Sequence, residues 1–156
     1  MARSNDEIRG FLVQVGDERV LLPNATVAEL LSRVPVQPVA DTPHWMPGKI
    51  EWQGWQVPLF SMVDLGGFGH EPVTANSKIV VLKTLSGSGT MPYIGLMTRS
   101  FPRLITVPRD GLLADASEES LPEGVQMRVL LGDEAALLPD LEMIERLVAE
   151  AIAQPA

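Results

Sequence analysis

Short runs of apolar residues, separated by turn residues, recur along the whole chain. Their length and their Gly, Pro, Asp and Asn boundaries are typical of β-strands joined by tight turns. The predicted strands are 11–15, 19–22, 49–52, 55–60, 78–84, 93–98, 104–107, 125–131 and 135–138, and 34–40 is predicted as a strand or edge segment. The run 78–84 (KIVVLKT) is almost continuously apolar, which predicts a strand buried on both faces. The pattern therefore indicates a mostly β fold, with about five strands in each of two small barrels.

The clearest hairpin lies between Lys49 and Phe60. Gln53-Gly54 forms its two-residue loop, in which glycine supplies the positive φ that a tight hairpin turn requires. Pro58 cannot donate a hydrogen bond to a neighbouring strand. The second strand of this hairpin is therefore predicted to lie at a sheet edge or to end near Pro58.

Helices are predicted in few places. A short helix over 27–31, capped by Asn24 or Thr26, is indicated by apolar residues at i, i+3 and i+4. One further helical turn is predicted at 62–65. A longer helix, 140–153, opens after a proline. The apolar stripe of that helix consists of Leu141, Ile144, Leu147, Val148 and Ile152.

Composition and charge restrict the partners that the chain can have. The chain has 156 residues, enough for one domain with a sizeable core, and a net charge of −8. That charge argues against nonspecific binding to nucleic acid or to an anionic membrane, so we expect protein partners. The absence of cysteine fits a reducing compartment. The N-terminal segment is charged and no apolar run approaches the roughly 20 residues that span a bilayer. We therefore expect a cytoplasmic protein without direct membrane insertion.

Residues for catalysis or metal binding form no recognisable constellation. His44 and His70 are the chain's two histidines, and we interpret both as exposed loop residues rather than metal ligands. The glycine–serine segment 87–89 lacks the lysine and the spacing of a phosphate-binding loop. We therefore expect a protein that is not an enzyme and has no cofactor or metal. No set of residues in the sequence supports the alternative that the protein is a small hydrolase or a metal-dependent enzyme.

The central stretch TPHWMPGKIEWQGWQVPLF (42–60) contains the pattern P-x-W-x-x-G-x-I-x-x-x-G-x-x-V-P. This pattern resembles the centre of CheW-like domains, adaptor modules that couple chemoreceptors to a histidine kinase. The resemblance continues in order over nearly the full chain through FLVQVGD (11–17), VAEL (27–30), IVVL (79–82), YIGL (93–96) and LLPDL (137–141). It implies one domain over 8–154, built as two five-stranded SH3-like barrels that share a hydrophobic core. The approximate subdomains are 8–70 and 76–140, followed by the C-terminal helix 140–153.

The resemblance also implies a noncatalytic function. In this family, one surface binds the regulatory domain of a CheA-type histidine kinase and another binds the cytoplasmic tip of a chemoreceptor. The positions of this chain that match partner-binding positions of the family are Val27, Glu29, Gly48, Gln53, Gly54 and Phe101. The alternative is an SH3-like interaction module with a partner outside chemosensory signalling.

Three residues depart from the family's usual pattern. Gln53 stands where arginine is usual, Ser61 replaces the acid of V-P-x-x-D-L, and Arg99 replaces an aspartate after the V-G-L strand. Charge changes near partner surfaces alter specificity, which is a difference of affinities. We therefore expect a specialised adaptor, and a pathway of type IV pilus-mediated motility is a natural candidate.

Large apolar residues near these positions leave two interpretations open. At least one of Trp45, Trp52 and Trp55 is predicted to lie in the core, whereas an exposed one would be a hot spot for protein binding. Val27 and Phe101 pose the same question, because each fits either core packing or the rim of a receptor groove.

Overall fold

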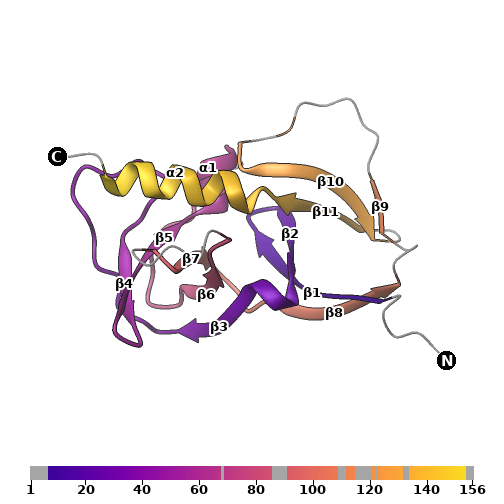
Figure 1. The fold of residues 1–156 in the computed structure, drawn as a ribbon, viewed down its shortest axis with the longest axis horizontal. Coiled ribbons are helices and arrows are strands. Elements are labelled where there is room, and N and C mark those ends of the chain that lie inside the picture. The colour runs from indigo at the N-terminus through magenta and orange to yellow at the C-terminus, as the bar shows by residue number, and fades with distance from the viewer. Residues whose placement is uncertain are drawn as a thin grey trace.

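The computed structural model describes residues 7–67, 69–85, 91–108, 112–114, 121, 123–131 and 134–153 (Figure 1). The elements in this part of the chain are, in order, β1 (Glu7–Val15), β2 (Glu18–Pro23), a 3-10 helix (Asn24–Thr26), β3 (Val27–Ser32), β4 (Lys49–Trp52), β5 (Trp55–Phe60), α1 (Met62–Gly66), β6 (Lys78–Lys83), β7 (Tyr93–Thr98), β8 (Arg103–Pro108), β9 (Leu112–Ala114), β10 (Val125–Leu131), β11 (Glu134–Pro139) and α2 (Leu141–Ala153).

Within the described residues, the strands form two sheets. One has six strands in the order β8-β1-β2-β11-β10-β9, and the other has five in the order β3-β6-β7-β5-β4. The six-stranded sheet joins both ends of the chain, because β8 returns to pair with β1 and β11 lies parallel to β2. The five-stranded sheet comes entirely from the middle of the chain (Figure 1). The sheets therefore do not follow the sequential division at 8–70 and 76–140 that the sequence suggested.

Strand β6 shows how the two sheets bury their side chains. Ile79 and Val81 point into a cluster inside the five-stranded sheet, together with Ile50, Val57, Leu59 and Met97. Val80 and Leu82 point the other way, into a cluster that both sheets share. This arrangement follows from the alternation of side chains along a strand. The predicted burial of this strand on both faces is confirmed.

The shared cluster is the largest of the hydrophobic clusters. Its members from the six-stranded sheet are Val13, Val15, Val20, Leu22, Val125 and Leu137, and those from the other sheet include Phe60, Val80, Leu82, Ile94 and Leu96. A separate small cluster of Leu12, Leu21, Val129 and Ala136 fills the interior of the six-stranded sheet. The prediction of a mostly β fold, in which two small barrels share a hydrophobic core, is confirmed.

Helix α2 covers one side of the shared core. Ile144 and Val148 are fully buried in it, and Leu141 and Leu147 pack against it. Ile152 continues the same stripe one turn after Val148, but its side chain is 53% exposed because it lies beyond the shared core. The helix extends past the core toward β4 and β5 (Figure 1). There Ile152 lines a surface cavity.

Residues 27–31 form strand β3 and not the expected helix. β3 pairs with β6 along its length, with a bulge between Val27 and Glu29. Leu30 packs against the shared core, whereas Leu31 packs against the cluster inside the five-stranded sheet. The spacing that suggested one helical stripe therefore belongs to a strand with apolar side chains on both faces. A single 3-10 turn is the helical structure before it.

Smaller expectations met mixed outcomes. The helical turn expected at 62–65 is α1. The segment 34–40, expected as a strand or edge segment, forms no named strand and makes one isolated bridge between Gln37 and Lys49, because its prolines interrupt the ladder. Residues Leu112–Ala114, within the polar segment 110–123, pair with β10 as strand β9. The segment 87–89 lies outside the described residues.

Candidate partner-binding surfaces

The tight turn between β4 and β5 places Gln53 and Gly54 on the surface. Both residues have positive φ, 51° for Gln53 and 82° for Gly54. Two consecutive positive φ angles give the type I′ turn, whose twist matches that of the flanking strands. The turn predicted from Gln53-Gly54 is confirmed. Gln53 is the less suited of the two residues, because its Cβ crowds the backbone in this conformation.

We expect Gln53→Asn to stabilise the protein by about 0.5 kcal/mol, because asparagine adopts positive φ more readily than glutamine does. The change in unfolding free energy would be measured by urea denaturation. Gln56→Asn is the matched control, since Gln56 is exposed on β5 and asparagine is disfavoured in strands. An equal gain at both positions would show that turn strain is not the cause.

Aromatic side chains surround this turn. The Trp52 Nε1 donates a 2.8 Å hydrogen bond to Glu29 Oε1. The Trp52 and Tyr93 rings meet edge to face at 4.8 Å between centroids, and the Trp55 ring lies 6.2 Å from that of Tyr93. We call Glu29, Trp52, Gln53, Gly54, Trp55 and Tyr93 the hairpin surface. It brings three of the predicted site residues together.

The bond between Glu29 and Trp52 also has a structural consequence. β3 and β4 are the two opposite edges of the five-stranded sheet. A hydrogen bond between their side chains therefore draws the edges together, as closure of a barrel requires. Glu29 thus serves the fold as well as the surface. The resemblance of segment 27–30 to the family cannot separate these two roles.

The three tryptophans differ in how deeply they are buried, which is the question that the sequence left open. Trp45 packs against the shared core and is only partly exposed. Trp52 is half-buried and packs against the cluster inside the five-stranded sheet. Trp55 is 41% exposed and is the candidate anchor for a partner.

Val27 and Phe101 lie apart from each other, and Val27 precedes Glu29 of the hairpin surface by two residues on β3. Val27 pairs with Leu82 near the end of β6 and packs partly buried against the shared core. Phe101 follows β7, is 53% exposed, and has the Lys78 Nζ 5.3 Å from its ring centroid. Lys78 begins β6, so these two predicted residues lie toward opposite ends of that strand. The structure therefore favours core packing for Val27 and an exposed contact for Phe101.

Gly48 allows two backbone segments to pass close to each other. A Cβ at this position would overlap the carbonyl oxygen of Gln37. Lys49, the residue after Gly48, exchanges backbone hydrogen bonds of 2.8 and 2.9 Å with Gln37. Glycine is therefore required where segment 34–40 crosses closely over the start of β4.

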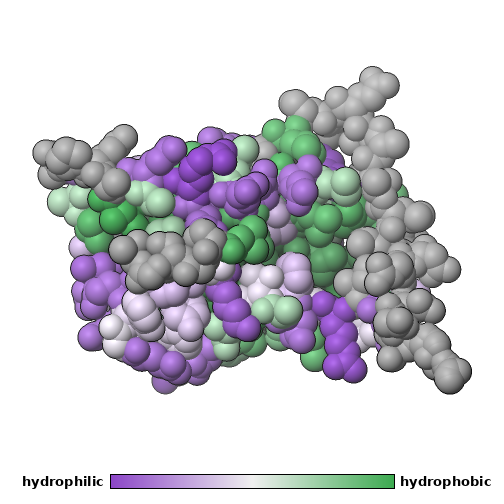
Figure 2. Space-filling model, in the orientation of Figure 1, coloured by the Kyte–Doolittle hydropathy of each residue, from purple (hydrophilic) through white to green (hydrophobic). Residues whose placement is uncertain are grey.

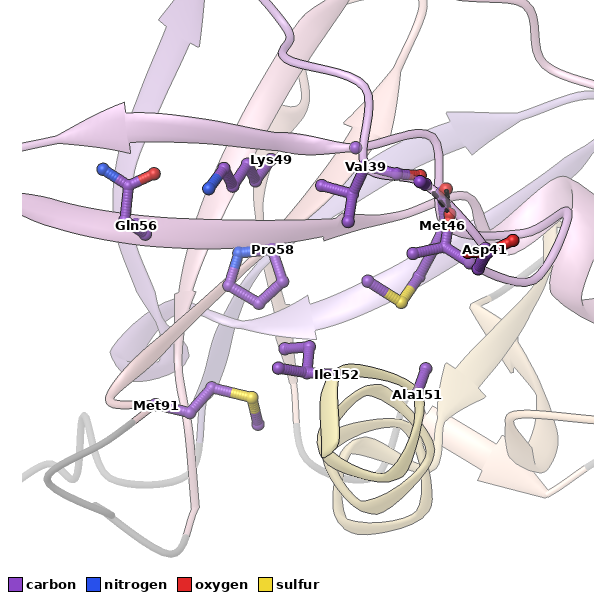
Figure 3. A pocket seen from close by; sticks show the side chains of 12 residues that line it. Val39, Asp41, Met46, Lys49, Gln56, Pro58, Met91, Ala151 and Ile152 are labelled. Atoms are coloured by element: carbon purple, nitrogen blue, oxygen red, sulfur yellow. Dashed lines mark hydrogen bonds between the residues drawn. The ribbon is translucent and has the colours of Figure 1, made fainter. Parts of the chain in front are cut away.

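A surface cavity lies beside Gly48, between the 39–49 segment, β5 and the end of α2. Its volume is about 330 Å³, and Met46 and Ile152 point into it from opposite sides (Figure 3). Lys49 and Gln56 lie on the side formed by β4 and β5 (Figure 3). Figure 2 shows hydrophobic surface beside the end of α2 and a hydrophilic outer side along most of the helix.

Ser61 replaces the family's acid without loss of a helix cap. Its Oγ accepts a hydrogen bond from the Asp64 backbone N at 3.3 Å and donates to Asp64 Oδ2 at 2.7 Å. The Asp64 carboxylate also bonds to the His70 Nδ1 at 2.8 Å and accepts from the Glu71 backbone N at 3.2 Å. The Ser-x-x-Asp pattern of a capping box is the sequence signal for this network, which was not among the predictions.

Asp64 is the buried centre of this network. Burial by itself raises the pKa of its carboxyl group, but the hydrogen bonds from Ser61, His70 and Glu71 together hold that pKa below the ordinary 3.8. His70 itself is exposed, as the sequence suggested, and His44 reaches the Asp64 carbonyl oxygen with its Nε2 at 3.3 Å. The network therefore ties the connector after α1 to the helix.

This geometry predicts a loss of stability in acid. Because the pKa of Asp64 is lowered on folding, its contribution is complete above the ordinary value of 3.8 and is lost as the pH falls through the lowered pKa. Asp64→Asn should cost about 1–3 kcal/mol at neutral pH and flatten the acid limb of the stability curve. Urea denaturation between pH 2 and 7, roughly, checks this. Asp41→Asn is the control, since Asp41 is exposed, and an unchanged acid limb in Asp64→Asn would contradict the prediction.

Arg99, the third departure, is engaged with the same connector. Its Nε lies 3.3 Å from Glu71 Oε2, and the Glu71 side chain is buried whereas that of Arg99 is largely exposed. A buried carboxylate requires a partner, and Arg99 provides one. The positive charge that replaces the family's aspartate at this position is therefore paired with a negative charge within the chain.

The described residues contain no group of three or more His, Cys, Asp or Glu placed to hold a metal ion. In the same part of the chain, no helix has the length and apolar character needed to cross a membrane.

The sequence as a whole matches the model of one protein family. The CheW-like domain model matches residues 9–148, which is most of the 156-residue chain. The chain belongs to the CheW-like domain family. A search of curated proteins finds no match.

A solved structure agrees with this assignment. The scaffolding protein TtCheW from Thermoanaerobacter tengcongensis superposes with a TM-score of 0.72 at 17% sequence identity, over 86% of this chain and 89% of that one. The likeness shows the CheW fold of two SH3-like barrels. On this CheW-like fold, the structure brings Glu29, Gln53 and Gly54 together and leaves Gly48 and Phe101 at separate places. Val27 lies two residues before Glu29 on β3, but its side chain packs against the shared core. Lys78, which contacts Phe101, and Tyr93, which contacts Trp52 and Trp55, were not among the predicted site residues, although Tyr93 begins the YIGL segment.

Proposed function

We propose that this CheW-like chain is a noncatalytic adaptor that couples a chemoreceptor to a CheA-type histidine kinase. The observation that carries the proposal is the separation of two exposed surfaces on a family fold. The hairpin surface presents Trp55 beside Gln53, and Phe101 is presented elsewhere, beside Lys78. Two separate surfaces are what a bridging protein needs, since both partners must be bound at once.

We assign the regulatory domain of the kinase to the hairpin surface. An exposed tryptophan whose ring packs edge to face on a neighbouring tyrosine ring has the character of an interface hot spot. The uncharged Gln53 in place of arginine removes a charged fork from this surface, which would change the choice of kinase. We assign the cytoplasmic tip of the receptor to the surface that contains Phe101.

Trp55→Ala is expected to weaken binding to the kinase regulatory domain at least about tenfold, because its ring is the largest exposed apolar group on the hairpin surface. Calorimetric titration of the purified protein against the regulatory domains of the CheA-type kinases of its own cell measures this. Val73→Ala is the control, since Val73 is also an exposed apolar residue but lies outside the hairpin surface.

Failure of the folded protein to bind any of these kinases would overturn the coupling function. It would leave an SH3-like interaction module with another partner. Binding to one kinase, reduced equally by both substitutions, would place the kinase on another surface.

The pathway is the finer part of the proposal. The departures at Gln53 and Arg99 support a specialised cytoplasmic adaptor, and we assign it to control of type IV pilus-mediated motility. Deletion of the gene should then impair surface motility and leave swimming intact. The opposite phenotype would assign the chain to flagellar chemotaxis.

A further inference from the structure

The surroundings of Phe101 differ in charge from the rest of the protein. A cavity of about 240 Å³ is lined by Leu12, Gln14, Arg19, Ser100, Phe101, Arg103 and Glu134. Lys78 contacts the Phe101 ring from the five-stranded sheet. Among the described residues that line this cavity or contact the ring, three are cationic and one is anionic. The chain as a whole has a net charge of −8, so this is a local excess of positive charge.

The two arginines share a single carboxylate. Arg19 Nε lies 3.6 Å from Glu134 Oε2, and Arg103 Nη2 lies 3.4 Å from Glu134 Oε1. All three side chains are substantially exposed. A guanidinium has five N–H donors in a planar fork, and each of these contacts uses one nitrogen. After pairing with the Glu134 carboxylate, the two arginines therefore keep a net positive charge and further N–H donors that a second carboxylate could use.

The position of Phe101 is held by the crossing between the two sheets. Thr98 Oγ1 lies 3.0 Å from the Gln14 carbonyl oxygen and 3.3 Å from that of Ser100. Gln14 belongs to β1 of the six-stranded sheet, whereas Thr98 ends β7 of the other. Phe101 is therefore an exposed apolar side chain on an anchored segment, which limits the entropy lost when a partner packs against it.

We propose that Phe101, Lys78, Arg19 and Arg103 form a docking surface for an acidic protein segment, in which an apolar side chain packs on Phe101 and a neighbouring carboxylate pairs with the arginines. This inference rests on the proposed function and specifies its receptor side. The receptor tip that fits carries Asp or Glu beside an apolar residue. Charge complementarity carries the choice of partner, since Arg pairs with carboxylates through two parallel hydrogen bonds.

The test uses the full chain and cytoplasmic tip fragments of the chemoreceptors of its own cell. Phe101→Ala and Arg103→Glu are each expected to raise the Kd at least about tenfold, and binding of the wild-type protein should weaken with added salt. Replacement of the fragment's acidic residues by Gln or Asn should reproduce the loss. Arg146→Glu makes the same change of net charge on the exposed side of α2 and should leave the Kd within about twofold.

Each result has a defined meaning. If Phe101→Ala and Arg103→Glu left the Kd unchanged, this inference would be overturned, but receptor coupling would stand. Equal weakening by Arg146→Glu would also overturn it, because net charge rather than this surface would be responsible. No binding of any fragment to the folded protein would overturn both receptor coupling and the inference. Self-association in sedimentation that Phe101→Ala abolishes would assign the surface to a second copy of the chain instead.

Discussion

Gly48→Ala is expected to destabilise the fold by about 3–5 kcal/mol, a large fraction of the stability of a typical domain. The new Cβ would overlap the Gln37 carbonyl oxygen and lie 3.1 Å from Val36 Cγ1. The backbone cannot shift easily, because Gly48's own carbonyl accepts a 2.9 Å hydrogen bond from the Leu59 N–H. Urea denaturation monitored by tryptophan fluorescence measures the loss.

Gly54→Ala is the matched control for this prediction. A Cβ at Gly54 meets nothing within 4 Å, so only the cost of its positive φ remains. That cost is about 1 kcal/mol. If the two substitutions had equal effects, close packing at Gly48 would not be the reason for its glycine.

The contrast between these glycines changes how binding defects are interpreted. Gly48 was predicted as a partner-binding residue from its place in the family's motif. The structure gives it a role in the close crossing of two backbone segments. A loss of partner binding in Gly48→Ala is therefore expected through unfolding, and only a folded variant that fails to bind would support direct contact.

Strand positions were predictable where burial alone determines the pattern. The run 78–84 had to be a strand buried on both sides, because no charge interrupts its centre and β-branched residues dominate it. The Gln53-Gly54 turn was predictable because glycine has few other reasons to follow a β-prone run. Both features depend on neighbouring residues, so they can be read locally.

Pairing between distant segments was not predictable in the same way. Nothing in the sequence of β8 indicates that it leaves the sheet of β7 to pair with β1. Residues 27–31 fit a helix by spacing, and only the pairing with β6 makes them a strand. Tertiary pairing decides such short segments, because the intrinsic preferences involved are small.

The site residues were predicted from the resemblance to the family, but their contacts and roles became clear only from the three-dimensional structure. Glu29 bonds to Trp52 across the two edges of a sheet, and Arg99 neutralises the buried Glu71. Both contacts are long-range in sequence, so no local pattern reveals them. The exposure of Trp55 and Phe101 also follows from packing that the sequence does not display.

Ile144→Ala is expected to cost about 3 kcal/mol in unfolding free energy, through lost burial and the cavity left behind. Ile144 has no exposed surface and lies in the cluster to which both sheets contribute. Urea denaturation followed by far-UV circular dichroism reports both sheets. Tryptophan fluorescence reports β4, β5 and the segment before them, since all three tryptophans lie there. Because the core is shared, both probes should shift to the same lower midpoint.

Ile152→Ala is the control on the same helix, because it removes the same atoms from a side chain that is 53% exposed. It should change the unfolding free energy by less than about 0.5 kcal/mol. Equal costs at the two positions would mean that α2 does not pack on the core through Ile144. If the fluorescence midpoint stayed in place while the dichroism midpoint fell, the two sheets would unfold separately. The shared cluster would then not couple the hairpin surface to the surface around Phe101 in one cooperative unit.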